Sequence, residues 1–103
     1  MKPAICLDPL YPELAPEEKI ERIATAGFQY VEFWGWRDKN VPDLLEACRR
    51  NQVEVVNFSG HRAGSPVASD THELFLEDLA DAVDTARQLN CSILMLLTNA
   101  LNE

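Results

Sequence analysis

The stretch Gly27-Phe28-Gln29-Tyr30-Val31-Glu32-Phe33-Trp34-Gly35-Trp36 contains the end of a predicted helix, a predicted strand and the loop that follows it. Its first glycine can adopt the left-handed conformation that closes a helix. Val31 and Phe33 then alternate with aromatic or acidic residues, as in a strand that buries one face against helices. A carboxylate between two aromatic rings needs water, a partner or a ligand. Function is therefore expected on the face that carries Tyr30, Glu32 and Trp34.

Four predicted strands alternate with three predicted helices along the whole chain. The strands are residues 4–7, 30–34, 53–58 and 93–97, which are rich in apolar or β-branched side chains. The last is almost continuously apolar, which is typical of a parallel strand buried on both faces.

Helix boundaries are marked by capping residues. Pro16 predicts the start of the first helix, and Pro42 lies in the first turn of the second. The second helix is expected to end at Asn51 in the left-handed conformation, and Asn90 is expected to close the third. Asp70 and Glu73 have the spacing of a capping pair at the start of the third helix.

This alternation predicts a parallel α/β sheet with right-handed crossovers, βαβαβαβ, in one domain covering residues 1–103. The first three strands begin about 25 residues apart, which is typical of barrel repeats. The sequence is compatible with an open flavodoxin-like sheet or with part of a (β/α)8 TIM barrel. Both place function at the carboxyl ends of the strands. The residues expected to meet at that rim are Asp8, 34–36, 59–62 and 98–99.

The composition argues against several classes of function. Seventeen acidic against nine basic side chains give a net charge of -8, which opposes binding to nucleic acid and to anionic membranes. Cys6, Cys48 and Cys91 are far apart, as expected of reduced thiols in a cytoplasmic protein. No apolar segment has the form of a signal peptide or the length of a membrane span. We expect a cytoplasmic protein that binds neither nucleic acid nor membrane.

Several side chains of the predicted rim are candidates for binding or catalysis. No glycine-rich nucleotide signature is present. His61 could bind a metal, a carboxylate or a sugar hydroxyl, and Arg62 could bind a carboxylate or pair with a neighbouring acid. Glu32 could be a general base, although a structural acceptor is the more common role at such a position. Trp34 is expected to form a pocket wall, and the role of Trp36 is left open.

Other polar residues are expected to be solvated. His72 lies in the first turn of the third helix. The acidic side chains of that helix are expected to form one solvated face that binds no metal: Glu73, Glu77, Asp78, Asp81 and Asp84.

Two segments match the pattern of a known family. They are the stretch 27–36 and Asn57-Phe58-Ser59-Gly60-His61-Arg62-Ala63-Gly64-Ser65. Together they resemble the xylose-isomerase-like TIM barrels, and most closely the hydroxypyruvate isomerase branch. The first segment is common to many sugar isomerases, epimerases and endonuclease-four-type enzymes, whereas Ser-Gly-His-Arg is more selective. The likeness extends from the first strand through the fourth.

The resemblance implies isomerisation of a small hydroxy-carbonyl compound through an enediol, with hydroxypyruvate going to tartronate semialdehyde as the leading case. It implies a divalent ion, Mg or Mn, that polarises the substrate oxygens and two glutamates that move the proton. In the family these glutamates and the metal ligands lie on later strands. The chain is therefore expected to be the N-terminal half of a barrel, truncated or encoded in two pieces, inactive and binding no metal by itself.

The resemblance assigns substrate-facing positions to this half, but no catalytic residue and no metal ligand: Glu32, Trp34, His61, Arg62 and Asn99. The expected ligand is a keto acid or a sugar. Open edges on the first and fourth strands would invite pairing with a C-terminal half-barrel or a second copy. One alternative is a non-catalytic half-barrel that binds a small polar ligand or self-associates. Another is a sugar epimerase or an endonuclease-four-type relative, the latter disfavoured by the acidity.

Overall fold

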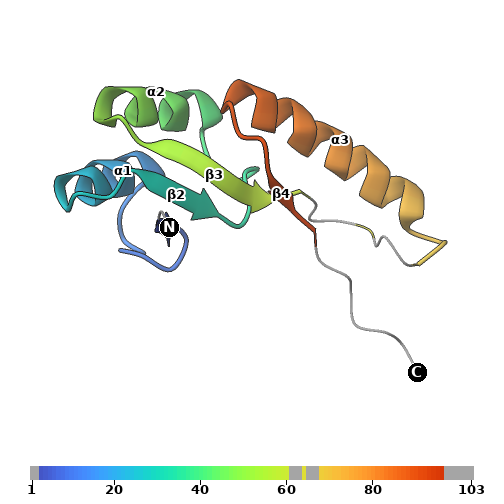
Figure 1. The fold of residues 1–103 in the computed structure, drawn as a ribbon. Coiled ribbons are helices and arrows are strands. Elements are labelled where there is room, and N and C mark those ends of the chain that lie inside the picture. The colour runs from blue at the N-terminus through green and yellow to red at the C-terminus, as the bar shows by residue number, and fades with distance from the viewer. Residues whose placement is uncertain (1–2, 61–63, 65–67, 97–103) are drawn as a thin grey trace.

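The computed structural model describes residues 3–60, 64 and 68–96. Within these residues a parallel sheet is covered by helices on one side (Figure 1). The elements follow the order β1 (Ala4–Cys6), α1 (Pro16–Thr25), β2 (Tyr30–Phe33), α2 (Val41–Asn51), β3 (Glu54–Ser59), α3 (His72–Gln88) and β4 (Leu94–Met95). The predicted βαβαβαβ order is confirmed.

The strand order in the described sheet is β1-β2-β3-β4, so each strand pairs with the next one along the chain. All three pairings are parallel: Ala4 lies opposite Tyr30, and Phe58 lies opposite Leu94. Right-handed crossovers between neighbouring strands place the connecting helices on one face. The register between β2 and β3 shifts at Val31 and Glu32. The other face of the sheet is the one that carries polar residues.

The alternation predicted for β2 is confirmed. Val31 and Phe33 are fully buried against the helices, whereas Tyr30 and Glu32 are only half-buried on the opposite face. The ring of Phe33 stacks on that of Phe58 from β3, with centroids 4.9 Å apart. This aromatic pair lies in the core between the sheet and its helices, which is completed chiefly by aliphatic side chains: Leu7, Ile20, Ile23, Leu44, Val53, Val55, Ala82 and Leu89.

The helix ends agree with the sequence in part. Helix α1 begins at Pro16, and Gly27 follows it with a φ of 95°, a left-handed conformation that glycine adopts without strain. Asn90 has a φ of 54° after α3, as predicted. Helix α2 is instead closed by Gln52, with a φ of 56°; Asn51 stays helical, and its amide donates to the Ala47 carbonyl.

The predicted cap of α3 is wrong. The helix begins at His72, two residues beyond Asp70, with Thr71 as the N-cap. The Thr71 side chain makes no capping hydrogen bond to the first turn. Asp70 and Glu73 therefore do not act as a capping pair. Their negative charges still lie near the positive end of the helix dipole, an interaction that needs no direct hydrogen bond.

Strand β4 also differs from its prediction as a strand buried on both faces. Leu94 packs against the core, but Ile93, Met95 and Leu96 are 59%, 37% and 48% exposed. For Ile93 and Met95 the reason is that no described helix covers the face of the sheet on which they lie. An apolar strand sequence predicts that both faces of the strand are covered by other parts of the protein. It does not show whether those parts are present.

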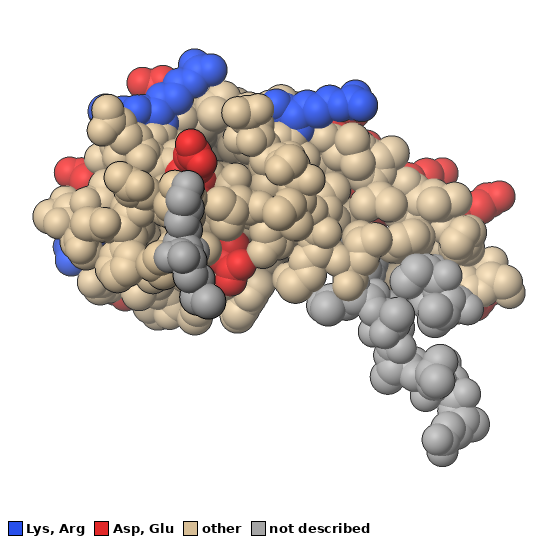
Figure 2. All heavy atoms as spheres, in the orientation of Figure 1, with Lys and Arg blue, Asp and Glu red and all other residues tan. Residues whose placement is uncertain are grey.

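The three cysteines are free, with Cys48 and Cys91 buried and Cys6 half-buried. Burial raises the pKa of Cys48 to about 11 and raises that of Cys91. In the described residues no helix is both long enough and apolar enough to cross a membrane. On the face shown in Figure 2 the Lys and Arg side chains lie mainly along the upper edge, and the surface over the sheet is largely uncharged.

Candidate functional site

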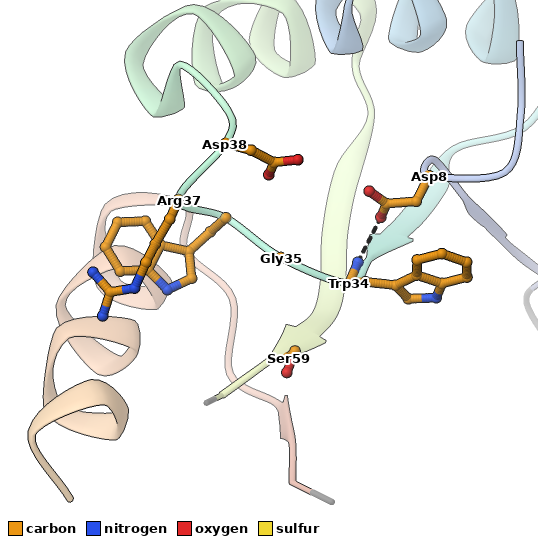
Figure 3. Close-up of a pocket in the computed structure, with 7 residues that line it drawn as sticks. Asp8, Trp34, Gly35, Arg37, Asp38 and Ser59 are labelled. Atoms are coloured by element: carbon orange, nitrogen blue, oxygen red, sulfur yellow. Dashed lines mark hydrogen bonds between the residues drawn. The ribbon is translucent and has the colours of Figure 1, made fainter. Parts of the chain in front are cut away.

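A pocket of about 370 Å³ lies at the carboxyl ends of the first three strands. Its walls come from one residue just beyond β1, from the β2–α2 loop and from the last residue of β3: Asp8, Trp34, Gly35, Trp36, Arg37, Asp38 and Ser59 (Figure 3). This volume falls within the roughly 300–1,000 Å³ of small-molecule sites. Because parallel strands all end at this rim, residues distant in sequence meet there.

Asp8 joins the end of β1 to the β2–α2 loop. Its Oδ2 accepts a hydrogen bond of 2.6 Å from the backbone N–H of Trp34, drawn as a dashed line in Figure 3. Its Oδ1 accepts one of 2.9 Å from Nζ of Lys39. The Lys39 side chain is only 4% exposed, and its ammonium also donates to the Gly35 carbonyl. The buried ammonium of Lys39 thus finds hydrogen-bond acceptors on both sides, and these bonds connect the β2–α2 loop to Asp8.

Arg37 fixes the other side of the same loop. Its Nε donates to Oδ1 of Asp78 at 3.0 Å, and Nη2 donates to Oδ2 of Asp81 at 3.3 Å. The guanidinium also lies 4.5 Å from the centre of the Trp36 ring, a cation–π distance. The hydrogen bond to Asp78 is the main cause that raises the pKa of Arg37. Arg37 therefore ties the pocket loop to α3.

The contact with Arg37 corrects the prediction of a fully solvated acidic face on α3. Asp78 is 7% exposed, whereas Asp81 is 59% exposed. The helix turns Asp78 toward the sheet, where the guanidinium compensates its charge. A charge run on an amphipathic helix does not reveal that one of its members faces a partner 41 residues away. The other acids and His72 are exposed, as predicted.

Glu32 lies on the helix-free face of the sheet beside Asn57 of β3. The amide Nδ2 of Asn57 donates to Oε2 of Glu32 at 2.7 Å, and the buried Oδ1 of the same amide has no hydrogen-bond partner within the described part of the chain. Among the described residues, Asn57 is the one hydrogen-bond partner of this carboxylate. Glu32 is thus an acceptor, and it retains capacity for a further hydrogen bond.

Cys6 lies opposite Glu32 in the register between β1 and β2. Burial is the main cause that raises the pKa of this thiol. The backbone N–H of Asp8 and the charge of Lys39 lower it, and the carboxylates of Asp8 and Glu32 raise it. Cys6 is therefore kept in its neutral form, as a small apolar lining of the helix-free face.

The structure places two of the five predicted site residues. Trp34 lines the pocket and is 56% exposed, and Glu32 lies on the same face two residues earlier. His61, Arg62 and Asn99 lie outside the described residues. Three polar residues beside these positions were not predicted as site residues, namely Asp8, Lys39 and Asn57. The strand-end rule already placed Asp8 at the rim, but a lysine in a polar loop carries no comparable signal.

The described residues do not fit a metal site by themselves. They contain no group of three or more His, Cys, Asp or Glu side chains arranged to hold an ion. Asp8 is engaged by Lys39 and Trp34, and Glu32 is held by Asn57. No chemical step is therefore assigned to a metal in this part of the molecule.

The fold and the position of the pocket define a partial TIM barrel, a parallel α/β sheet with its polar residues at the carboxyl ends of the strands. The profile of the xylose isomerase-like TIM barrel family matches residues 20–103. The chain belongs to this family, whose members include isomerases and AP endonucleases and often use divalent metals.

Two solved structures share the fold. A family 2 AP endonuclease from Brucella melitensis superposes with a TM-score of 0.80 at 21% sequence identity, covering 92% of this chain and 40% of that protein. A xylose isomerase-like TIM barrel/4-hydroxyphenylpyruvate dioxygenase fusion protein superposes with a TM-score of 0.74 at 21% identity, covering 93% of this chain and 16% of that protein. No curated protein matches the chain. The chain thus spans less than half the length of either structural relative.

Proposed function

We propose that this chain forms the substrate-facing part of an isomerase barrel that acts on a small hydroxy-carbonyl compound, with hydroxypyruvate as the leading substrate. The observation that carries the proposal is the Glu32 carboxylate, which is held by Asn57 at 2.7 Å on the helix-free face of the sheet. Two residues further along the chain, Trp34 exposes more than half of its surface at the pocket. A fixed acceptor beside an exposed ring suits a small hydroxylated ligand, because such sites combine an aromatic wall with a few placed polar groups.

Each of these two residues has a chemical role in the proposal. Glu32 accepts a hydrogen bond from a substrate hydroxyl through the capacity that Asn57 leaves free. The Trp34 indole covers the carbon skeleton of the substrate. His61, Arg62 and Asn99 complete the substrate contacts as the family resemblance implies. The proton-transfer glutamates and the ligands of a divalent ion are assigned to parts of the barrel outside residues 1–103.

The charges of the described pocket bear on the choice between a keto acid and a sugar. Arg37 is paired with Asp78 and Asp81, and Lys39 is paired with Asp8. Neither cation is free to bind a substrate carboxylate without losing its present partner. A keto acid would therefore rely on Arg62, whereas an uncharged sugar would not. For this reason the assay includes both classes.

The experiment uses the protein expressed from the reading frame that contains residues 1–103. Hydroxypyruvate, or a set of free aldoses and ketoses, is incubated in D2O with Mn²⁺ or Mg²⁺ and followed by proton NMR. Enediol chemistry predicts deuterium at the former carbonyl carbon of the tartronate semialdehyde formed from hydroxypyruvate, and at the hydroxymethyl carbon of substrate that has returned from the enediol. Glu32→Gln keeps the shape of the side chain but removes its charge, and it should raise KM. Absence of exchange and of product with every substrate would refute the proposal.

A second candidate is a non-catalytic half-barrel that self-associates. The observation that favours it is the exposure of Ile93 and Met95 on the face that no described helix covers. Light scattering distinguishes the two: a dimer without isomerase activity supports the second candidate. An epimerase acting on a sugar would show exchange without a change in carbonyl position. An abasic-site cleavage assay tests the endonuclease relationship, which the net charge of -8 disfavours.

A further inference from the structure

We propose that Asp8 and Lys39 are positioning residues that hold Trp34 at the pocket in a fixed, ligand-ready position. This inference rests on the proposed function in so far as Trp34 is taken to contact the substrate. Asp8 also lines the pocket, whereas Lys39 lies behind it and acts through Asp8 and the loop backbone.

The contact between Asp8 and the backbone of Trp34 is the first observation. The carboxylate accepts the Trp34 N–H at 2.6 Å from 26 residues away in sequence. A backbone hydrogen bond fixes the chain at the point where the indole leaves it, and a charged acceptor makes the bond stronger than a neutral one. The indole itself gains little from burial because it stays 56% exposed. The restraint that the structure shows on the position of Trp34 is therefore the one on its backbone.

The burial of Lys39 is the second observation. Its side chain is 4% exposed, and its ammonium bridges Asp8, at 2.9 Å, and the Gly35 carbonyl, with a third contact of 3.3 Å to Oδ1 of the exposed Asp38. It also lies 5.0 Å from the centre of the Phe33 ring. A buried ion pair is a poor source of stability compared with apolar side chains of similar volume. It does select one loop conformation, because Asp8 and Gly35 can satisfy the same ammonium in few other arrangements.

The opposite end of the loop has its own anchor. Arg37 bonds Asp78 and Asp81 of α3 and lies over the ring of Trp36. In Figure 3 the Trp34 indole extends toward the side of Asp8, whereas Arg37 reaches the opposite side of the loop. Each tryptophan thus has a separate anchor. This separation yields an experiment in which each anchor serves as the control for the other.

The experiment is ¹⁹F NMR of the whole protein labelled with 5-fluorotryptophan, with the Trp34 and Trp36 signals assigned by Trp34→Phe and Trp36→Phe. Asp8→Ala should move the Trp34 signal toward the shift of the free amino acid and narrow it, and it should leave the Trp36 signal in place. Arg37→Gln should do the reverse. Asp43→Asn makes a similar change of charge at an exposed position of α2 and should leave both signals unchanged.

Two milder variants guard against misfolding, and circular dichroism checks each fold. Lys39→Met keeps the length of the side chain without its charge and should mobilise Trp34 as Asp8→Ala does. Asp8→Asn keeps one acceptor oxygen and should give an intermediate shift. If the Trp34 signal is unchanged in folded Asp8→Asn and Lys39→Met, the proposed positioning role is wrong.

Kinetics separate this inference from the proposed function. With hydroxypyruvate as substrate, Lys39→Met, which lies outside the pocket lining, should raise KM several-fold and leave kcat within about twofold of the wild type, because the indole is lost as a preorganised binding surface. A fall in kcat at unchanged KM would overturn the positioning role. If the wild type shows no turnover, the proposed function fails, and the fluorine spectra still decide whether Asp8 and Lys39 hold Trp34.

Discussion

Replacing Phe58 by alanine tests the account of the core. Phe58 is fully buried, and its ring stacks on Phe33 with centroids 4.9 Å apart and planes inclined by 14°. Removing a buried phenylalanine ring costs about 3–5 kcal/mol, through the lost transfer free energy and the cavity left behind. Stacked rings add about 0.5–1.5 kcal/mol to their area term. We expect a loss of about 4 kcal/mol, a large part of the roughly 5–15 kcal/mol that stabilises a domain.

The assay is urea unfolding followed by far-ultraviolet circular dichroism. Phe28→Ala is the matched control, because Phe28 is 37% exposed and its truncation leaves no enclosed cavity. That variant should lose only about 1–2 kcal/mol. If Phe58→Ala loses no more free energy of unfolding than Phe28→Ala, the stacked pair is not the centre of the core.

Two further predictions concern pH and substrate. Burial raises the pKa of the Cys48 thiol from 9.0 to about 11, so between these values the folded protein keeps a proton that the unfolded chain releases. The free energy of unfolding should therefore fall with rising pH, by up to about 1.4 kcal/mol per pH unit. A plot of this free energy against pH should have a shallower slope for Cys48→Ala than for the wild type. Equal slopes would contradict the raised pKa of Cys48. His61→Ala should lower kcat/KM for the substrate at least about tenfold without loss of fold, whereas the exposed His72 provides a His→Ala control with unchanged kinetics.

Much of the fold could be predicted because each element carries its own local signal. Val31 and Phe33 alternate with polar residues, so β2 shows both its buried face and its functional face. Pro16 and Gly27 mark the limits of α1 through backbone restrictions that act within a few residues. The βα alternation then implies the strand order and the side of the helices. The parallel sheet and the rim pocket both follow from these local features.

The sequence could not predict which distant side chains become partners. Lys39 and Asp8 are 31 residues apart, and Arg37 and Asp78 are 41 apart. Such pairs depend on the sheet register and on the rotation of α3, which local patterns do not encode. Asp78 was predicted as part of a solvated acidic face, and Asp8 was placed at the rim with no indication of its partner. The exposure of Met95 was missed for a related reason, because burial of a strand depends on neighbours that its own residues do not specify.

The order of pairing in the sheet also has a consequence for how the protein folds. Because β1, β2, β3 and β4 pair strictly in chain order, each pairing within the described sheet joins a strand to the one made just before it. The pairing of Ala4 with Tyr30 is possible once α1 and β2 have been synthesised, and the pairing of Phe58 with Leu94 comes last. Such short loop closures favour rapid folding. The described sheet can therefore add one strand at a time as the chain leaves the ribosome, because each new strand pairs with the strand made just before it.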